Sequence, residues 1–466
     1  MKTNQLGGQI GTDPIFVVSE AGGPRADRPE DVASGDELRL TTQEREVYEG
    51  GRGVVLQKTI RAVVAYGRLY GASHLVALDG APHHALSWGS NGTAPLLKIY
   101  RQLVEAGLST YAPFTANPRP MDPTNLPLTD EESEAVGKIY NRTDELAELY
   151  HELGMRSSGD WSCASYLPEV GNTPDYGQAL AWSESSAVVF VNSVIGARTN
   201  RNPIGIDMLC SILGKAPCYG LMTDDGRRAT QLIEYRASSL ASPQIIGPAI
   251  GRMVAGEIPY ITGLDRFLTD IDRRSIGFLK DLGAAIASNG GVGLFHLEGI
   301  TPEAIRFGRE LLTEDHRTRH IDDDTLARVR AGDHHRWRDP EGVPRRVFLG
   351  CPHLSVGQMV EWGERIVAAL SEACRTTIAL PTHFFGSPLV RKVFSETHPE
   401  LAEALVQSGV TFPDSCPMMW CSTPLEGAEM VATNSTKTRV FTTARYFPDD
   451  VLTKLIVTGE LPERAR

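Results

Sequence analysis

The residues best suited to chemistry gather in one segment, where a run of apolar residues gives way to polar groups. Residues 187–191 form a short, β-branched and uncharged run, which is typical of a buried parallel strand. The polar residues that follow are Asn192, Ser193, Arg198, Thr199, Asn200 and Arg201. Ligands in open α/β sheets bind beyond the carboxyl ends of strands, and an arginine can bind two oxygens at once. The segment therefore predicts a clamp for a carboxylate or phosphate, with a solvated turn as the alternative.

Three of the seven cysteines share one setting. Cys163 lies in a loop, and Cys351 and Cys416 each follow a predicted strand and precede a proline. Strand ends in an α/β fold converge on a common cleft, where three thiolates could hold a metal ion or an iron–sulfur cluster. Buried inert thiols are the alternative, since the three lie far apart along the chain. The cysteines at 210, 218, 374 and 421 show no comparable pattern.

A second concentration of ionisable groups lies at residues 313–346, which include four histidines and many charged residues. These histidines lack the tight spacing of metal ligands, although metal binding is conceivable. We therefore expect a solvated, charged insertion rather than a metal site.

The elements that position these residues belong to a large acidic chain. A length of 466 residues is enough for two or three lobes, and residues 1–38 are expected to form a flexible leader. A net charge of −12 without a long basic block argues against nucleic-acid binding. No apolar run approaches the roughly 18 residues of a membrane helix, and no signal-peptide core is present. With an odd number of cysteines, these features predict a cytoplasmic protein.

Predicted helices and strands alternate along residues 39–466. Glycines at 50–53 divide the helical pattern of residues 42–70, and Thr129 with Glu132 has the spacing of a capping box. Further on, helical patterns at 243–254, 273–288, 355–373 and 389–407 alternate with strand patterns at 258–261, 291–296, 347–350, 377–380 and 410–412. This alternation predicts an α/β fold with parallel sheets.

Several motifs in one order resemble the large subunit of aconitase X, a branch of the aconitase superfamily of iron–sulfur dehydratases. The resemblance runs from about Leu40 to about Arg445. Its most specific part is AWSESSA at 181–187, leading to NSVIGARTNR at 192–201 and GKAP at 214–217. Further matches are GCPHLS at 350–355, DSC at 414–416 and TNSTK at 433–437.

The resemblance implies an aconitase-like fold with parallel and mixed sheets, lacking the small swivelling domain, which is expected as a separate subunit. It implies that Cys163, Cys351 and Cys416 hold an iron–sulfur cluster. It also implies a hydro-lyase that removes water from a small hydroxy acid, with cis-3-hydroxy-L-proline as the first candidate. The alternatives are a phosphorylated hydroxy acid such as mevalonate 5-phosphate, a catalytically degenerate iron–sulfur binding protein, or a cluster-free enzyme for a phosphorylated ligand.

The residue types suit that chemistry. Arg198 and Arg201 would fix an anionic substrate group and stabilise developing charge, and Lys437 is a second cation candidate. His296 at a strand end would move a proton, or is a core histidine. The base that removes the proton is expected from the small subunit. Orienting hydrogen bonds are expected from Asn192, Ser193, Thr199, Asn200, Asn434 and Ser435.

Overall fold

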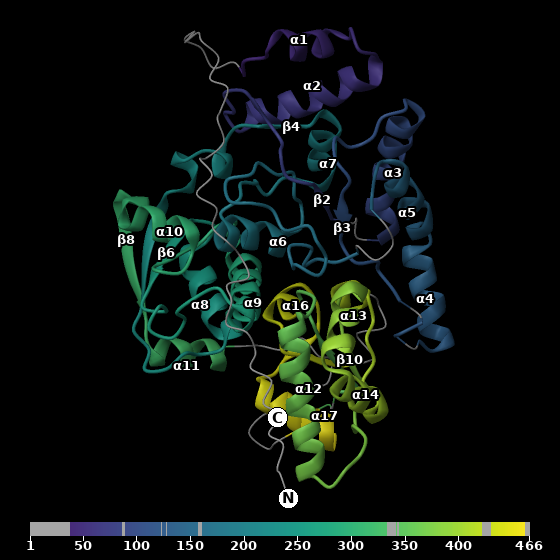
Figure 1. Cartoon of the computed structure of the whole chain (residues 1–466), viewed down its shortest axis with the longest axis vertical. Helices are drawn as coiled ribbons and strands as arrows, with labels where there is room; N and C mark the ends of the chain where they lie inside the picture. The colour runs from purple at the N-terminus through teal and green to yellow at the C-terminus, as the bar shows by residue number, and fades with distance from the viewer. Residues whose placement is uncertain are drawn as a thin grey trace, which may run out of the picture.

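A computed structural model gives the fold of the chain (Figure 1). The structure describes residues 38–85, 89–122, 124–126, 128–156, 161–332, 342, 344–421 and 430–461, without the side chains of 89–92, 273 and 274. Residues 1–37 of the predicted leader and the histidines at 334 and 335 lie outside these residues, whereas Leu38, the last residue of that leader, is described and buried.

Two helices, α1 (Thr42–Glu49) and α2 (Val54–Leu69), cover one end of the molecule, at the top of Figure 1. The capping box of Thr41 and Glu44 starts α1, and Gly50 ends it at a φ of 100°, which favours glycine. The predicted division of residues 42–70 into two helices is therefore confirmed. Below them, β1 (Leu75–Ala77) pairs antiparallel with β4 (Lys215–Pro217).

A helical layer stands beside a small parallel pair of strands, β2 (His83–His84) and β3 (Thr115–Ala116). The capping box predicted at Thr129 is present and begins α4. The helices of this layer are α3 (Gly89–Glu105), α4 (Asp130–Tyr140), α5 (Thr143–Glu152) and α7 (Ile204–Leu213).

The strand predicted at residues 187–191 is wrong. This stretch belongs to a helix, α6 (Ser185–Phe190), which continues as a π-helical turn, η2 (Val191–Ile195). Every residue from 186 to 195 is buried, so the helix has no polar face and shows no helical period in the sequence. A five-residue apolar run cannot by itself distinguish a buried strand from a buried helix. Gly196, with a φ of 80°, ends the turn.

A four-stranded parallel sheet, which we call the second sheet, has the order β7-β6-β5-β8. The last strand of this sheet, β8, and the helix α11 that follows it lie within residues 313–346, apart from the first residue of β8. Part of the predicted solvated insertion is therefore regular structure. Backbone hydrogen bonds hold β8 in the sheet, and most of its side chains are polar and exposed. The segment therefore lacks the apolar pattern of a buried strand, and its sequence is similar to that of a loop. The elements are β5 (Ala229–Tyr235), β6 (Pro259–Thr262), β7 (His296–Leu297), β8 (Leu312–Ile321), α8 (Pro243–Val254), α9 (Arg273–Gly290), α10 (Pro302–Phe307) and α11 (Asp323–Ala331), with 3₁₀ turns η3 (Gly220–Met222), η4 (Asp225–Arg227) and η5 (Gly308–Leu311).

The third sheet is also parallel, in the order β10-β9-β11-β12. It forms the lower lobe in Figure 1 together with α12, α13, α14, α16 and α17. The predicted helix at 389–407 is two helices, divided before Pro399. The elements are β9 (Arg346–Leu349), β10 (Thr382–Phe384), β11 (Val431–Thr433), β12 (Arg445–Tyr446), α12 (Val356–Glu372), α13 (Pro388–Thr397), α14 (Pro399–Ser408), α15 (Pro417–Cys421), α16 (Thr436–Phe441) and α17 (Asp449–Thr458).

One hydrophobic core joins the parts of the fold that are built on the second and third sheets. It includes Phe190 of α6, Ile246 of α8 and Leu282 of α9, and it continues to Leu349 of β9 and Phe384 of β10. Helix α9 lies between the lobes and contacts α6, α8, α12 and α16. The α/β fold is thus confirmed, and the joint between the lobes brings the start of α6 next to α16.

Candidate functional site

The structure brings Cys163, Cys351 and Cys416 together at the joint between the lobes, and we call this group the three-cysteine site. All three are free, Cys163 and Cys351 are buried, and Cys416 is half-buried. Burial, followed by the Cys351 and Cys163 thiols, raises the pKa of Cys416. Burial and the nearby Glu184 carboxylate raise the pKa of Cys163 to about 12. Since such effects fade with distance, the Cys416 sulfur lies near the sulfurs of Cys351 and Cys163.

Each cysteine comes from a different part of the fold. The loop of Cys163 is held by a hydrogen bond of 2.8 Å from the Ser162 N–H to the Ala116 carbonyl, at the end of β3. Cys351 follows β9, and Cys416 precedes α15. Two cysteines thus lie at the carboxyl edge of the third sheet, and the loop beside β3 supplies the other.

His353 is completely buried among these loops. Its backbone N–H donates to the Cys163 sulfur at 3.3 Å. Its ring nitrogens lie 3.3 Å from the Ser162 hydroxyl (Nδ1) and 3.1 Å from the Ser415 carbonyl (Nε2). Burial lowers the pKa of His353 to about 4, so the ring is neutral at physiological pH. Sequence reasoning passed over this residue although it stands in the GCPHLS motif.

A buried ion pair borders the three-cysteine site. The Lys437 Nζ lies 2.5 Å from the Glu184 Oε1 and 3.2 Å from the Ser186 hydroxyl. Burial would lower the pKa of Lys437, but Glu184 and then the Cys351 and Cys163 sulfurs raise it well above its ordinary value. Of the predicted residues outside the cysteines, Lys437 is therefore the one whose charge the structure places next to them.

Glu184 was missed by the sequence reasoning, although it lies in the AWSESSA motif and is the N-cap of α6. Burial would raise its pKa, but Lys437 and hydrogen bonds lower it to about 2. The Asn117 amide donates to its Oε2 at 2.7 Å, and the Ser186 N–H donates to its Oε1 at 3.1 Å. A carboxylate among small and apolar neighbours was the available signal.

Two further predicted residues support the loops. Ser435 donates a hydrogen bond of 2.6 Å to the Cys351 carbonyl and accepts one from the Thr438 N–H as the N-cap of α16. The Asn434 amide donates to Asp449 at 3.2 Å. Ser435 thus fixes the Cys351 loop relative to the helix that carries Lys437.

The structure gives the predicted clamp residues Asn192 and Ser193 internal partners. The Asn192 Nδ2 donates to the carbonyls of Thr199 and Gly293 at 2.8 and 3.1 Å. Its Oδ1 accepts from the Thr199 N–H and from Arg227, each at 3.0 Å. An amide can make four hydrogen bonds, so no group of Asn192 is left for a substrate. The Ser193 hydroxyl accepts from the Phe295 N–H at 2.9 Å.

The remaining clamp residues face other neighbours. Arg198 binds the carboxylate of Asp224 and the Met222 carbonyl, and Arg201 is exposed beside Gly291 and Gly293. The Thr199 hydroxyl accepts from the Trp182 N–H at 3.3 Å, and Asn200 bonds Tyr219 and Leu221. Across the described ranges, no hydrogen bond or ion pair joins either arginine to the three-cysteine site.

His296 belongs to a separate buried network. Its Nε2 lies 2.8 Å from the Arg227 carbonyl, and its Nδ1 lies 3.8 Å from Glu303. Arg227 in turn binds Glu303 through two nitrogens at 2.7 and 2.9 Å. Burial lowers the pKa of His296, which fits a neutral core histidine.

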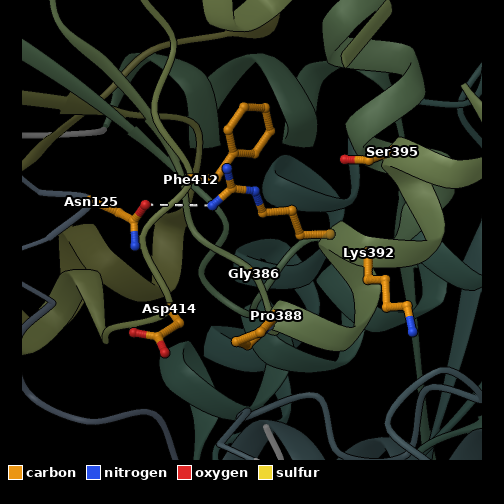
Figure 2. Close-up of a pocket in the computed structure, with 8 residues that line it drawn as sticks. Asn125, Gly386, Pro388, Lys392, Ser395, Phe412 and Asp414 are labelled. Carbon is orange, nitrogen blue, oxygen red and sulfur yellow. Dashed lines mark hydrogen bonds between the residues drawn. The ribbon is translucent and has the colours of Figure 1, made fainter. Parts of the chain in front are cut away.

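A pocket of about 340 Å³ lies beside the Cys416 loop (Figure 2). Arg391 crosses it, with its guanidinium over the Phe412 ring at 5.0 Å and its Nη1 3.4 Å from the Asn125 Oδ1. Asp414, on another wall, binds Arg119 at 3.0 Å. The lining residues are Asn125, Gly386, Pro388, Arg391, Lys392, Ser395, Phe412 and Asp414. Arg391 makes no ion pair with another described residue, so its guanidinium is a candidate group for binding an anion.

Family models for the aconitase X first domain and the aconitase X second domain match residues 37–225 and 229–331. A phosphomevalonate dehydratase large subunit from Thermococcus kodakarensis is 31% identical over 87% of this chain and 95% of its own length. The chain belongs to the aconitase X family. The predicted family membership is confirmed.

A further relative carries a second activity in its name. A cis-3-hydroxy-L-proline dehydratase from Pseudomonas aeruginosa is 29% identical, over 86% of this chain and 65% of its own length. The crystal structure of the Thermococcus kodakaraensis aconitase X holo-form has a TM-score of 0.73 and 28% identity, and the match covers 91% of this chain and all of that one. The two relatives named as dehydratases are carbon–oxygen lyases, the class of enzyme that the sequence predicted. In the ranges described, no helix is long and apolar enough to cross a membrane.

Proposed function

We propose that this chain is the large subunit of a dehydratase that removes water from a small hydroxy acid at an iron–sulfur cluster held by Cys163, Cys351 and Cys416. The observation that carries the proposal is the meeting of three free thiols from three loops next to the buried Lys437–Glu184 pair. Dehydration is the reaction named for the relatives.

The three thiols suit a cluster, because cysteine sulfurs are the usual protein ligands of iron–sulfur clusters. Among the described residues, no group of three or more His, Cys, Asp or Glu side chains is arranged to hold one metal ion. In a cluster each cysteine binds a different iron, so its ligand sulfurs lie farther apart than those around one ion. Burial raises the pKa of all three thiols, and nearby iron would favour their thiolate forms.

The proposed reaction assigns a charge-holding role to Lys437. When bound, a cluster with one open iron supplies a Lewis acid that makes hydroxide a workable leaving group. The ammonium of Lys437 has three N–H donors, of which Glu184 and Ser186 accept two. The third can bind the carboxylate or phosphate of a substrate and stabilise charge that develops on it. Glu184 keeps the lysine charged and oriented.

The substrate we propose is a small hydroxy acid with an anionic group. Cis-3-hydroxy-L-proline was the first candidate from the sequence, and mevalonate 5-phosphate is the second. The extent of the matches favours mevalonate 5-phosphate. The match spans 95% of the phosphomevalonate dehydratase large subunit from Thermococcus kodakarensis but 65% of the Pseudomonas aeruginosa hydroxyproline enzyme. The name of the Thermococcus kodakarensis relative, a large subunit, supports a small subunit as the partner.

The test is anaerobic reconstitution of the chain with iron and sulfide, followed by assay with its candidate small subunit. We expect visible absorption, stoichiometric iron, and water loss from one of the two acids only when both chains are present. Cys163→Ser should lose iron and activity, whereas Cys374→Ser, at an exposed cysteine, should keep both. A wild-type chain that takes up no iron, or a Cys163→Ser chain that keeps all of it, would overturn the proposal.

A further inference from the structure

One residue, His353, contacts all three cysteine loops through its ring and its backbone. His353 is two residues after Cys351, its backbone N–H donates to the Cys163 sulfur, and its ring bonds Ser162 and Ser415. Ser162 and Ser415 are the residues directly before the other two cysteines. The ring nitrogens thus span two loops, while the main chain of His353 belongs to the third.

The ring has one arrangement of protons that satisfies these contacts. A carbonyl only accepts hydrogen bonds, so the Nε2 carries the proton that binds the Ser415 carbonyl. In the neutral ring the Nδ1 then accepts from the Ser162 hydroxyl. That hydroxyl also accepts from the Ala164 N–H at 3.1 Å, which closes the turn around Cys163. The contacts therefore fix both the tautomer and the orientation of the ring.

The other supports act on one loop each. Ser435 binds the Cys351 carbonyl, and Lys280 donates to the Pro352 carbonyl at 3.1 Å. The Cys416 N–H donates to the Arg119 carbonyl at 2.9 Å. Among the hydrogen bonds of described residues, those of His353 alone connect one cysteine loop directly to another.

We propose that His353 is a positioning residue that sets the spacing of the three cysteine loops, and thereby the geometry in which Cys163, Cys351 and Cys416 bind a cluster. The cluster part of this inference rests on the proposed function, whereas the loop part concerns the cluster-free protein as well. Because outer hydrogen bonds orient metal ligands, loss of the imidazole should loosen all three thiols together.

The test compares three variants. His353→Phe keeps a ring in the buried site but removes both ring hydrogen bonds, and His353→Gln restores a donor near the Nε2 position. His383→Phe is the matched control, because His383 is also a buried imidazole, 4% exposed, but binds Thr411 at 2.8 Å and no cysteine loop. Thiol labelling of each cysteine, followed by mass spectrometry, is measured in native cluster-free protein, together with the melting temperature.

We expect His353→Phe to label Cys163, Cys351 and Cys416 about tenfold faster or more, since two lost hydrogen bonds favour local opening. His353→Gln should restore part of the protection. His383→Phe should leave these rates within about twofold even if its melting temperature falls equally. Unchanged rates in His353→Phe, or equal acceleration in His383→Phe, would overturn the positioning role.

A second readout separates this inference from the proposed function. After reconstitution, the visible band of His353→Phe should decay in air several-fold faster than that of the wild type and the control. If the wild type takes up no cluster while the labelling rates change as expected, the proposed function fails and the loop-positioning role stands. If the wild type takes up a cluster and His353→Phe has the same labelling rates and the same decay, the positioning role fails alone.

Discussion

Replacing Glu184 by glutamine should leave the ammonium of Lys437 buried without its counter-charge. The two side chains are 12% and 8% exposed, and the Nζ–Oε1 distance is 2.5 Å. Breaking a buried ion pair by removing one partner typically costs about 3–5 kcal/mol. We expect Glu184→Gln to lower the free energy of unfolding of the cluster-free chain by about that amount, measured by urea denaturation.

The double mutant gives the sharper result. In Glu184→Gln/Lys437→Met no charge remains buried, so the loss should be clearly smaller than the sum of the two single losses. The matched control is Glu298→Gln, which removes a partner of Arg309 at 3.0 Å in a pair with 32% and 63% exposure. That loss should stay below about 1 kcal/mol. A Glu184→Gln cost below 1 kcal/mol, or additive single losses, would refute the buried-pair reasoning.

Three further outcomes are expected. The folded chain lowers the pKa of Glu184 from an ordinary 4.5 to about 2. The stabilisation by this carboxylate is therefore complete above pH 4.5 and is lost as the pH falls towards 2. The difference in the free energy of unfolding between wild type and Glu184→Gln should shrink across that pH range. Gly251→Ala should destabilise the chain by about 1–3 kcal/mol, because its Cβ would lie 2.7 Å from the Ile286 carbonyl between α8 and α9; calorimetry of Gly251→Ala beside Gly137→Ala, in α4, where nothing lies within 4 Å, tests this. Asn192→Ala should cost at least about 2 kcal/mol in urea while the cysteine labelling rates stay at wild-type values; faster labelling would contradict the separation of the two networks.

Short-range signals in the sequence determined a large part of the fold. The predicted capping box at Thr129 and the glycine after α1 act within a few residues, so the helices that they begin or end appear at the expected places. The alternation of helix and strand patterns depends on local periodicity and correctly gave parallel sheets. The ordered motifs identified the family before the structure did. The same motifs marked Cys163, Cys351 and Cys416 as a set.

Tertiary contacts decided what local patterns could not. Residues 187–191 show no helical period because α6 and η2 are buried on all sides, so polar residues mark no face of the helix. Asn192 and Arg198 look free in the sequence, yet their partners Gly293, Arg227 and Asp224 come from distant segments.

The same holds at the three-cysteine site. Glu184 meets Lys437 across 253 positions of the chain, and the imidazole of His353 meets Ser162 across 191. No local period or spacing encodes such pairs. Their strength comes from burial, which removes competing water and is a property of the folded chain alone. The sequence by itself determined which residues could hold a cluster, and the tertiary structure decided which neighbours hold those residues.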